Sequence, residues 1–485
     1  MSFSSSLFLV YFLPVFLIPL FLIDRKYKNY WVLLASVFFY AWGAPTFVFV
    51  LLASVLIDFY LLRWMSGKEC ETRKILFWIS LLLNLGLLLY FKYMNFFVEQ
   101  LDILFGHFGA NPSPWLKVAL PLGISFITFQ KLAYTFDVYK RQFAPFEKLE
   151  HYAMYILMFP QLLSGPIVRP KQIAAQIADR SQQESIDDRL TGFSRFAIGL
   201  AKKVLIADVL GEQVNAIFAM NSAQLSSGMA WIGALAYTFQ IYFDFSGYTD
   251  MAIGIARMMG FRLPENFNSP YVSGSITEFW KRWHITLGSW FRDYVFLPLA
   301  YSISRKLPKE KYLGLRADKV IYLIATSVTF LLCGFWHGAA WTFILWGMYQ
   351  GLFLIFDRLF LLKYYKKAGR HVSVTITFFI TLFGWVLFRS ESLDFFRFYI
   401  RRMFAFRGGN NELWLNPKFW TVLMIAAVFS FIGFSKKAEA WQGKLYDMPK
   451  DAVIIGFSVL GMVLFVLSLA SITSTGFSPF IYFRF

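Results

Sequence analysis

Two of the five histidines stand where a side chain could do chemistry. His337 lies between two strongly apolar runs, with Gly334 and Gly338 on either side. An ionisable group inside an apolar segment is costly and indicates function, and glycines permit a helix break and the close approach of a ligand. We therefore predict that His337 is a general base, because the unperturbed pKa of a histidine side chain lies near neutral pH. The alternative is a neutral histidine hydrogen-bonded across a helix pair.

The second candidate, His284, ends an aromatic and basic stretch, Glu-Phe-Trp-Lys-Arg-Trp-His, at residues 278–284. The neighbouring Lys281 and Arg282 suggest an interfacial position as readily as a catalytic one. The other three histidines lie in polar or connecting stretches and are predicted to be solvated: His107, His151 and His371.

Two carboxylates, Asp244 and Asp250, occur inside a long apolar run. They are six residues apart and face different ways on a helix, which argues against a paired acid–base site. We interpret them as part of a hydrogen-bonded interior network that shapes a pocket. The Pro/Asn-rich turn that follows, at residues 264–271, is either a re-entrant loop that brings the acidic helix to the His284 segment or an ordinary surface connection.

Other chemical signatures are missing. No GxSxG elbow, GxGxxG loop or P-loop occurs, and no Cys/His cluster predicts a metal site. The two cysteines, Cys70 and Cys333, exclude a disulfide scaffold. Cys333 lies four residues before His337, so the two share a helical face, although a small buried hydrophobe is the favoured interpretation of this cysteine.

The elements that must position these groups are membrane helices. Of 485 residues, 58% are hydrophobic and 16% are charged, against about 25% charged in soluble domains, and the mean hydropathy is +0.52. Disorder is excluded, because a chain this apolar cannot stay solvated.

We predict an all-α, polytopic integral membrane protein that forms one domain, residues 1–485. Its motif-bearing core lies at about 1–390 and a C-terminal membrane extension at about 391–485. Prolines and glycines in the runs at 116–136 and 152–168 predict broken or re-entrant helices.

The net charge of +18 does not indicate nucleic-acid binding. Basic residues gather in short clusters between apolar runs, as positive-inside anchoring requires, and a share of them could attract an anionic cytosolic ligand. The first run, at residues 7–23, lacks a preceding Lys or Arg and a cleavage site, so we expect a spanning helix and not a signal peptide.

Several motifs occur in an order that resembles the membrane-bound O-acyltransferase family. They are Phe-Asp-Phe-Ser-Gly-Tyr (243–248), Pro-Glu-Asn-Phe-Asn (264–268), Glu-Phe-Trp-Lys-Arg-Trp-His (278–284), Trp-Phe-Arg-Asp-Tyr (290–294) and Phe-Trp-His-Gly (335–338). Earlier segments at 121–130 and 159–167 look similar too. Within the family, the Asp-Phe-Ser-Gly-Tyr-Thr-Asp-Met-Ala form at 244–252 is most similar to the bacterial branch that O-acetylates alginate.

The resemblance implies a ring of about 11–13 tilted transmembrane and re-entrant helices around a central tunnel, in the bacterial inner membrane. It implies that His337 is the catalytic histidine and His284 a second functional one. The donor would be cytosolic acetyl-CoA, with no permanently bound cofactor. The acetyl group would reach an extracytoplasmic polysaccharide directly or through a periplasmic O-acetyltransferase or secretion partner. Further residues expected to bind donor or substrate are Lys281, Arg282, Arg292, Asn266, Asp244 and Trp336.

Three alternatives stay open at this point. The acyl group could differ, as with D-alanine from a carrier protein or a long acyl chain. Broken helices with polar groups near the midplane also fit a transporter. The third is an assembly subunit without catalysis, in which both histidines would be dispensable.

Overall fold

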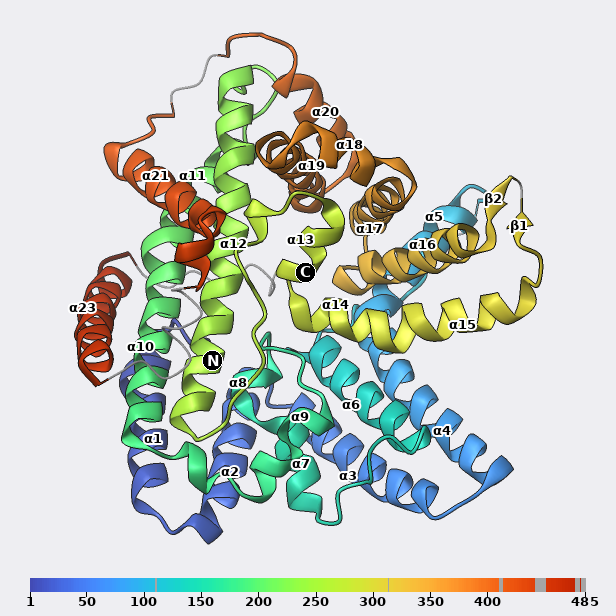
Figure 1. Ribbon diagram of the computed structural model, residues 1–485, viewed down its shortest axis with the longest axis vertical. Coiled ribbons are helices and arrows are strands. Elements are labelled where there is room, and N and C mark those ends of the chain that lie inside the picture. Colours follow the sequence, from blue (N-terminus) through green and yellow to red (C-terminus); the bar gives the residue numbers. More distant parts are fainter. Residues whose placement is uncertain (110, 313, 410–412, 441–450, 476–479, 481–485) are drawn as a thin grey trace. The chain divides into compact units, whose positions relative to one another are not determined.

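The computed structural model describes residues 1–109, 111–312, 314–409, 413–440, 451–475 and 480 (Figure 1). These residues are mostly helical, with very few in strands. The strands among them are β1 (Lys311–Tyr312) and β2 (Leu315–Arg316), which pair antiparallel with Lys311 opposite Arg316. The prediction of an all-α protein is confirmed.

Seven helical segments in the described part of the chain are long and apolar enough to cross a membrane. An α-helix needs about 20 residues to span the hydrocarbon core of a membrane. The protein is therefore a multi-pass membrane protein. Its helices expose large apolar side chains, such as Val459 and Val466 on α23 (Asp451–Thr475), as lipid contact requires. The segments are Phe47–Ser66, Cys70–Gly106, Ala317–His337, Trp341–Ala368, Arg370–Arg389, Pro417–Phe434 and Val453–Ser474.

The chain forms two compact units. The prediction that the chain forms one domain stays a prediction. The first unit comprises residues 1–192 and 252–264. Its helices are α1 (Leu13–Leu22), α2 (Arg25–Gly43), α3 (Phe47–Ser66), α4 (Cys70–Leu88), α5 (Met94–Gly106), α6 (Ile124–Tyr139), α7 (Leu149–Leu157), α8 (Phe159–Leu162) and α9 (Pro170–Ala178).

The second unit comprises residues 193–251 and 265–485 and holds both candidate histidines. Two helices, α10 (Ile186–Ala201) and α12 (Ser227–Met258), contribute residues to both units. The others are α11 (Asp208–Phe218), α13 (Ile276–Arg282), α14 (Ile285–Phe291), α15 (Leu297–Lys306), α16 (Ala317–His337), α17 (Trp341–Phe356), α18 (Leu362–Ala368), α19 (Arg370–Arg389), α20 (Leu393–Met403), α21 (Pro417–Phe431) and α23 (Asp451–Thr475).

The predicted helix breaks in the first unit are present. The apolar run at 116–136 becomes helical only at Ile124, after Pro121 and after Gly123 with its positive φ of 74°. The run at 152–168 is divided into α7 and the four-residue α8, which begins next to Pro160. Proline removes a helical N–H and clashes with the preceding turn, which explains both interruptions.

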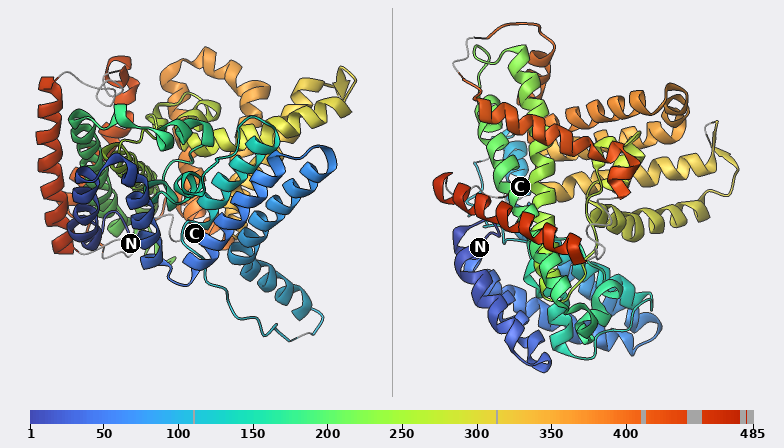
Figure 2. Two further views of the ribbon diagram at one scale, coloured as in Figure 1. Left: turned by 90° about the horizontal axis from the view of Figure 1, so that it is seen from below. Right: turned by 60° about the vertical axis from the view of Figure 1, so that its left-hand side comes forward.

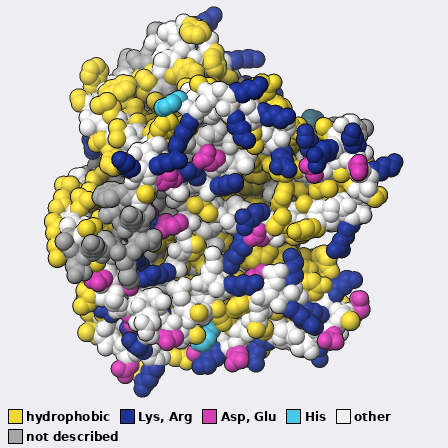
Figure 3. Space-filling model, in the orientation of Figure 1, with side chains coloured by type: hydrophobic (Ala, Val, Ile, Leu, Met, Phe, Trp, Pro, Cys, Tyr) yellow, Lys and Arg dark blue, Asp and Glu magenta, His cyan; other side chains and the backbone are white. Residues whose placement is uncertain are grey.

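In the second unit, α15 and α16 lie side by side and lead to the β1–β2 hairpin (Figure 2). Exposed cations gather around this hairpin, at the right of Figure 3. Cation clusters at the end of an apolar helix anchor that end at the cytoplasmic surface of a membrane. The exposed residues are Arg305, Lys306, Lys309, Lys311 and Arg316.

Candidate active site

His337 is the last residue of α16. The helix ends there because Gly338 adopts an extended conformation, with φ −165° and ψ 151°, and α17 begins only at Trp341. A Cβ atom on Gly338 would collide with the ring of Phe343. The glycine predicted to permit a helix break therefore does so, and His337 lies directly at the break.

The imidazole of His337 is enclosed by aromatic rings. Its centroid lies 4.8 Å from Trp336, 4.9 Å from Trp346 and 5.3 Å from Phe388. The residue is 5% exposed. Such a site excludes bulk water, which would otherwise compete in an acyl transfer.

His284 lies between α13 and α14, outside the seven long apolar helices. It is fully buried, and its backbone is left-handed, with φ 43° and ψ 54°. The edge of Phe245 meets its ring at 4.7 Å, and the Trp336 indole lies 6.3 Å away. Burial lowers the pKa of His284 to about 3, so the imidazole is neutral at physiological pH. Trp336 thus lies close to both histidines.

The turn at residues 264–271 is joined to the His284 segment by hydrogen bonds. The main-chain N–H of Ile285 donates to the carbonyl of Asn266 at 3.0 Å, and that of Asn268 donates to the carbonyl of Arg282 at 2.9 Å. The turn therefore contacts the His284 segment, as one of the two interpretations predicted, while its description as a re-entrant loop stays a prediction. Asn266 is fully buried, and its side chain faces His284 and Thr286.

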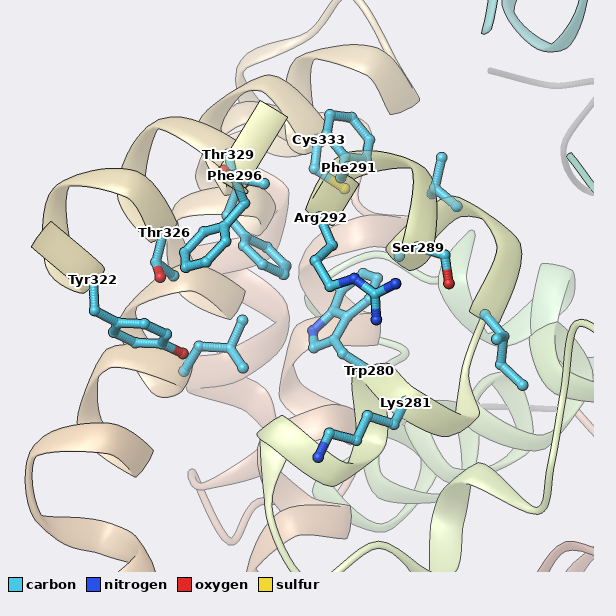
Figure 4. Close-up of a pocket in the computed structure, with 15 residues that line it drawn as sticks. Trp280, Lys281, Ser289, Phe291, Arg292, Phe296, Tyr322, Thr326, Thr329 and Cys333 are labelled. Atoms are coloured by element: carbon cyan, nitrogen blue, oxygen red, sulfur yellow. The ribbon is translucent and has the colours of Figure 1, made fainter. Parts of the chain in front are cut away.

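A cavity of about 340 Å³ lies in the same unit (Figure 4). Among the predicted site residues, Lys281 and Arg292 line it. The Arg292 side chain extends toward Trp280, and its pKa is raised by a hydrogen bond from the guanidinium to Asp293. The principal polar and aromatic lining residues are Trp280, Lys281, Ser289, Arg292, Tyr322, Thr326, Thr329 and Cys333.

Arg282 does not line this cavity. Its guanidinium donates to Glu278 at 2.9 Å and to Glu439 at 2.6 Å, and also to the carbonyl of Asn268. Although Lys281 and Arg282 are adjacent in sequence, the structure brings only Lys281 to the cavity wall.

The cavity is connected to His337 through side-chain contacts. Cys333 lines the cavity and lies one turn before His337 on α16. Trp280 also lines it and packs at 5.9 Å against Trp346, which contacts His337. The Trp280 indole N–H donates to the Oε1 of Gln350 at 3.3 Å. Trp280 therefore contacts both the cavity and Trp346, the indole that packs against His337.

The carboxylates in α12 form buried ion pairs. The ammonium of Lys203 lies 2.8 Å from Asp244, with both side chains at most 3% exposed. Asp250 pairs with Arg195 at 2.9 Å and with Lys202 at 2.6 Å. Both carboxylates therefore belong to an interior network, as predicted. Neither lines the cavity, so the prediction that this network shapes a pocket stays a prediction.

Several contributors were not anticipated from the sequence. Trp346, Phe388 and Gln350 lie in apolar runs whose periodicity marks them only as interior residues. Thr286 is a short polar residue two positions after His284, and only the folded turn pairs it with Asn266. The sequence signal that could have indicated an aromatic enclosure was the high density of tryptophan near both histidines.

A family model described as MBOAT, membrane-bound O-acyltransferase family, matches residues 124–393. The protein is therefore an acyltransferase with a helical membrane fold and buried histidines at helix breaks. It is a member of the membrane-bound O-acyltransferase family.

Among curated relatives, the chain is 35% identical to a probable alginate O-acetylase of Azotobacter vinelandii over the whole of both chains. It is also 35% identical to a peptidoglycan O-acetyltransferase of Helicobacter pylori, over 81% of this chain and 77% of the relative. A teichoic acid D-alanyltransferase of Bacillus subtilis is 32% identical over 56% of this chain and 69% of its own length.

Proposed function

We propose that this protein takes an acetyl group from cytosolic acetyl-CoA and transfers it across the bacterial inner membrane for O-acetylation of an extracytoplasmic polysaccharide. The observation that carries the proposal is His337, which is buried at a helix break one turn after Cys333. Cys333 lines a cavity that two basic side chains also line. The names of the two relatives at 35% identity, an alginate and a peptidoglycan O-acetylating enzyme, support an acetyl group and a glycan acceptor.

Lys281 and Arg292 suit the phosphates of the donor, because charge-assisted hydrogen bonds to phosphate are among the strongest available to a protein. The thioester would then extend along the cavity toward Trp280 and Cys333. Lys281 and Arg292 are retained as donor-binding residues in this proposal. Arg282 and Asp244 are assigned structural roles through their ion pairs.

In the chemical step, His337 accepts the proton of an acceptor hydroxyl while that oxygen bonds to the thioester carbonyl carbon. The carbon–sulfur bond breaks, and the proton passes to the departing thiolate, so the products are an acetyl ester and CoA thiol. The aromatic enclosure by Trp336, Trp346 and Phe388 limits hydrolysis. His284 is the second functional histidine, and the acceptor is either the glycan or a periplasmic partner.

The test uses the purified chain in proteoliposomes with labelled acetyl-CoA and a soluble glycan as the hydroxyl acceptor, and it follows CoA release. We expect release from the wild type and a loss of at least about 100-fold in His337→Ala. His107→Ala is the matched control, because His107 is exposed. Equal rates in wild type and His337→Ala would contradict the assigned role.

A second donor is favoured by one observation, the 32% identity to a teichoic acid D-alanyltransferase. The same proteoliposomes should therefore be offered a D-alanyl carrier-protein thioester. Transfer from the carrier protein without transfer from acetyl-CoA would replace the proposed donor while leaving the role of His337 intact.

A further inference from the structure

The side-chain oxygen of Asn266 is identified by its hydrogen bonds. Asn266 Oδ1 accepts the main-chain N–H of Thr286 at 3.1 Å and the Thr286 hydroxyl at 2.9 Å. A backbone N–H can only donate. The atom that faces Thr286 must therefore be the amide oxygen, since the amide nitrogen would meet another donor.

That same oxygen lies 3.1 Å from Nδ1 of His284. An amide oxygen has no proton to give, so a hydrogen bond between these atoms requires the proton on Nδ1. A neutral imidazole holds one ring proton, and Nε2 is then the basic nitrogen. From these contacts we infer that Asn266 is a positioning residue that fixes His284 as the neutral Nδ1–H tautomer, with Nε2 as its proton acceptor.

The surrounding structure holds the ring in this state. Asn266, Phe245 and Trp336 all contact the ring, and all three side chains are neutral. Its backbone is held in the left-handed region, which costs a non-glycine residue about 1–3 kcal/mol and persists where neighbouring contacts enforce it. The main-chain bonds between the 264–268 turn and the segment 282–285 supply those contacts.

This assignment changes the role expected of Asn266. The residue is fully buried and its oxygen already accepts protein donors, so it acts on the reaction through His284 and not by touching the donor. The tautomer itself is independent of the acyl group, but its importance for turnover rests on the proposed function of His284. An orienting group that selects a histidine tautomer is a known requirement when that histidine transfers protons.

The direct test is nitrogen NMR of the full-length protein in lipid nanodiscs with isotope-labelled histidine, assigned by comparison with His284→Gln. At neutral pH we expect a protonated Nδ1 and an unprotonated Nε2 at His284. A proton on Nε2, or on both nitrogens, would overturn the inference. This readout needs no turnover, so failure of the proposed function, seen as no acyl transfer from any donor, is separable from it.

Two variants extend the test. In Asn266→Ala the acceptor is lost, so we expect mixed tautomers and a fall in kcat of about 100-fold, with the donor KM within about twofold. Asn268→Ala is the matched control, because Asn268 is exposed in the same turn. Asn266→Asp keeps the oxygen but adds a charge that favours the imidazolium, so the acidic limb of its pH–rate profile should move to higher pH. An unchanged tautomer in Asn266→Ala, or an unmoved profile in Asn266→Asp, would contradict the positioning role.

Discussion

Gly334 and Gly347 face each other where α16 and α17 cross, and a Cβ atom added to Gly334 would lie 3.0 Å from the Cα atom of Gly347. Small residues let membrane helices approach closely enough for their backbones to pack. Because α16 ends at His337, this crossing sets the position of the imidazole against Trp346 on α17.

Replacing Gly347 with alanine tests this crossing. The new Cβ atom would collide with the carbonyl of Phe330, so we expect a loss of about 1–3 kcal/mol, the range for overpacking, together with reduced acyl transfer. The measurement is the thermal unfolding midpoint in detergent micelles. Gly456→Ala on α23 is the control, since no atom beyond its chain neighbours and its own helix backbone lies within 4 Å of the added Cβ. Equal losses in the two variants would show that the crossing is not tightly packed.

The buried His284 makes stability depend on pH. Burial lowers its pKa to about 3 in the folded protein, whereas an unfolded histidine titrates near about 6.5. Between these values the unfolded chain binds more protons, so the free energy of unfolding should fall as pH falls. At about pH 5 the loss is about 2 kcal/mol. The unfolding midpoint of His284→Gln should therefore drop less between about pH 7 and pH 5 than that of wild type, while His107→Gln should follow wild type.

The two basic residues of the cavity should govern donor affinity. Lys281→Ala and Arg292→Ala are each expected to raise the KM for acetyl-CoA by about 3- to 10-fold with kcat nearly unchanged, because partly exposed charges are screened by solvent. Higher salt should raise the wild-type KM in the same direction. Lys306→Ala serves as the control, because Lys306 is an exposed residue at the end of α15. A double variant with wild-type KM would remove both residues from the donor site.

The ion pairs of α12 should matter for stability more than for chemistry. Asp250→Asn removes the carboxylate that Arg195 and Lys202 share, while Arg195 keeps its ion pair with Glu265. Breaking a buried pair costs about 3–5 kcal/mol, so the unfolding midpoint should fall markedly. Asp394→Asn, whose side chain is 91% exposed and pairs with Arg397, should leave the midpoint near wild type. A stable Asp250→Asn protein without activity would instead assign Asp250 to the site.

Much of this architecture could be predicted from local sequence. The long apolar runs predicted an all-α membrane fold, and Pro121, Gly123 and Pro160 predicted which helices are broken. Gly338 marked the end of α16 beside His337. These features depend on the conformational limits of single residues, which sequence reports directly.

The composition of the site was less predictable. Lys281 and Arg282 are alike in sequence, yet Glu439, 157 residues away, pairs with Arg282 while Lys281 lines the cavity. Trp346 contacts His337 only because two helices cross closely. Such outcomes follow from tertiary packing between distant segments, and no local pattern encodes them.

The cavity wall also contains a thiol that can report on occupancy. The chain has two cysteines, of which Cys70 is exposed and Cys333 is buried at the cavity. In a Cys70→Ser background, a small thiol-reactive label would modify only Cys333, and any molecule that fills the cavity would slow the labelling. Candidate acyl donors could thus be ranked by protection alone, before an acceptor or a partner protein is identified.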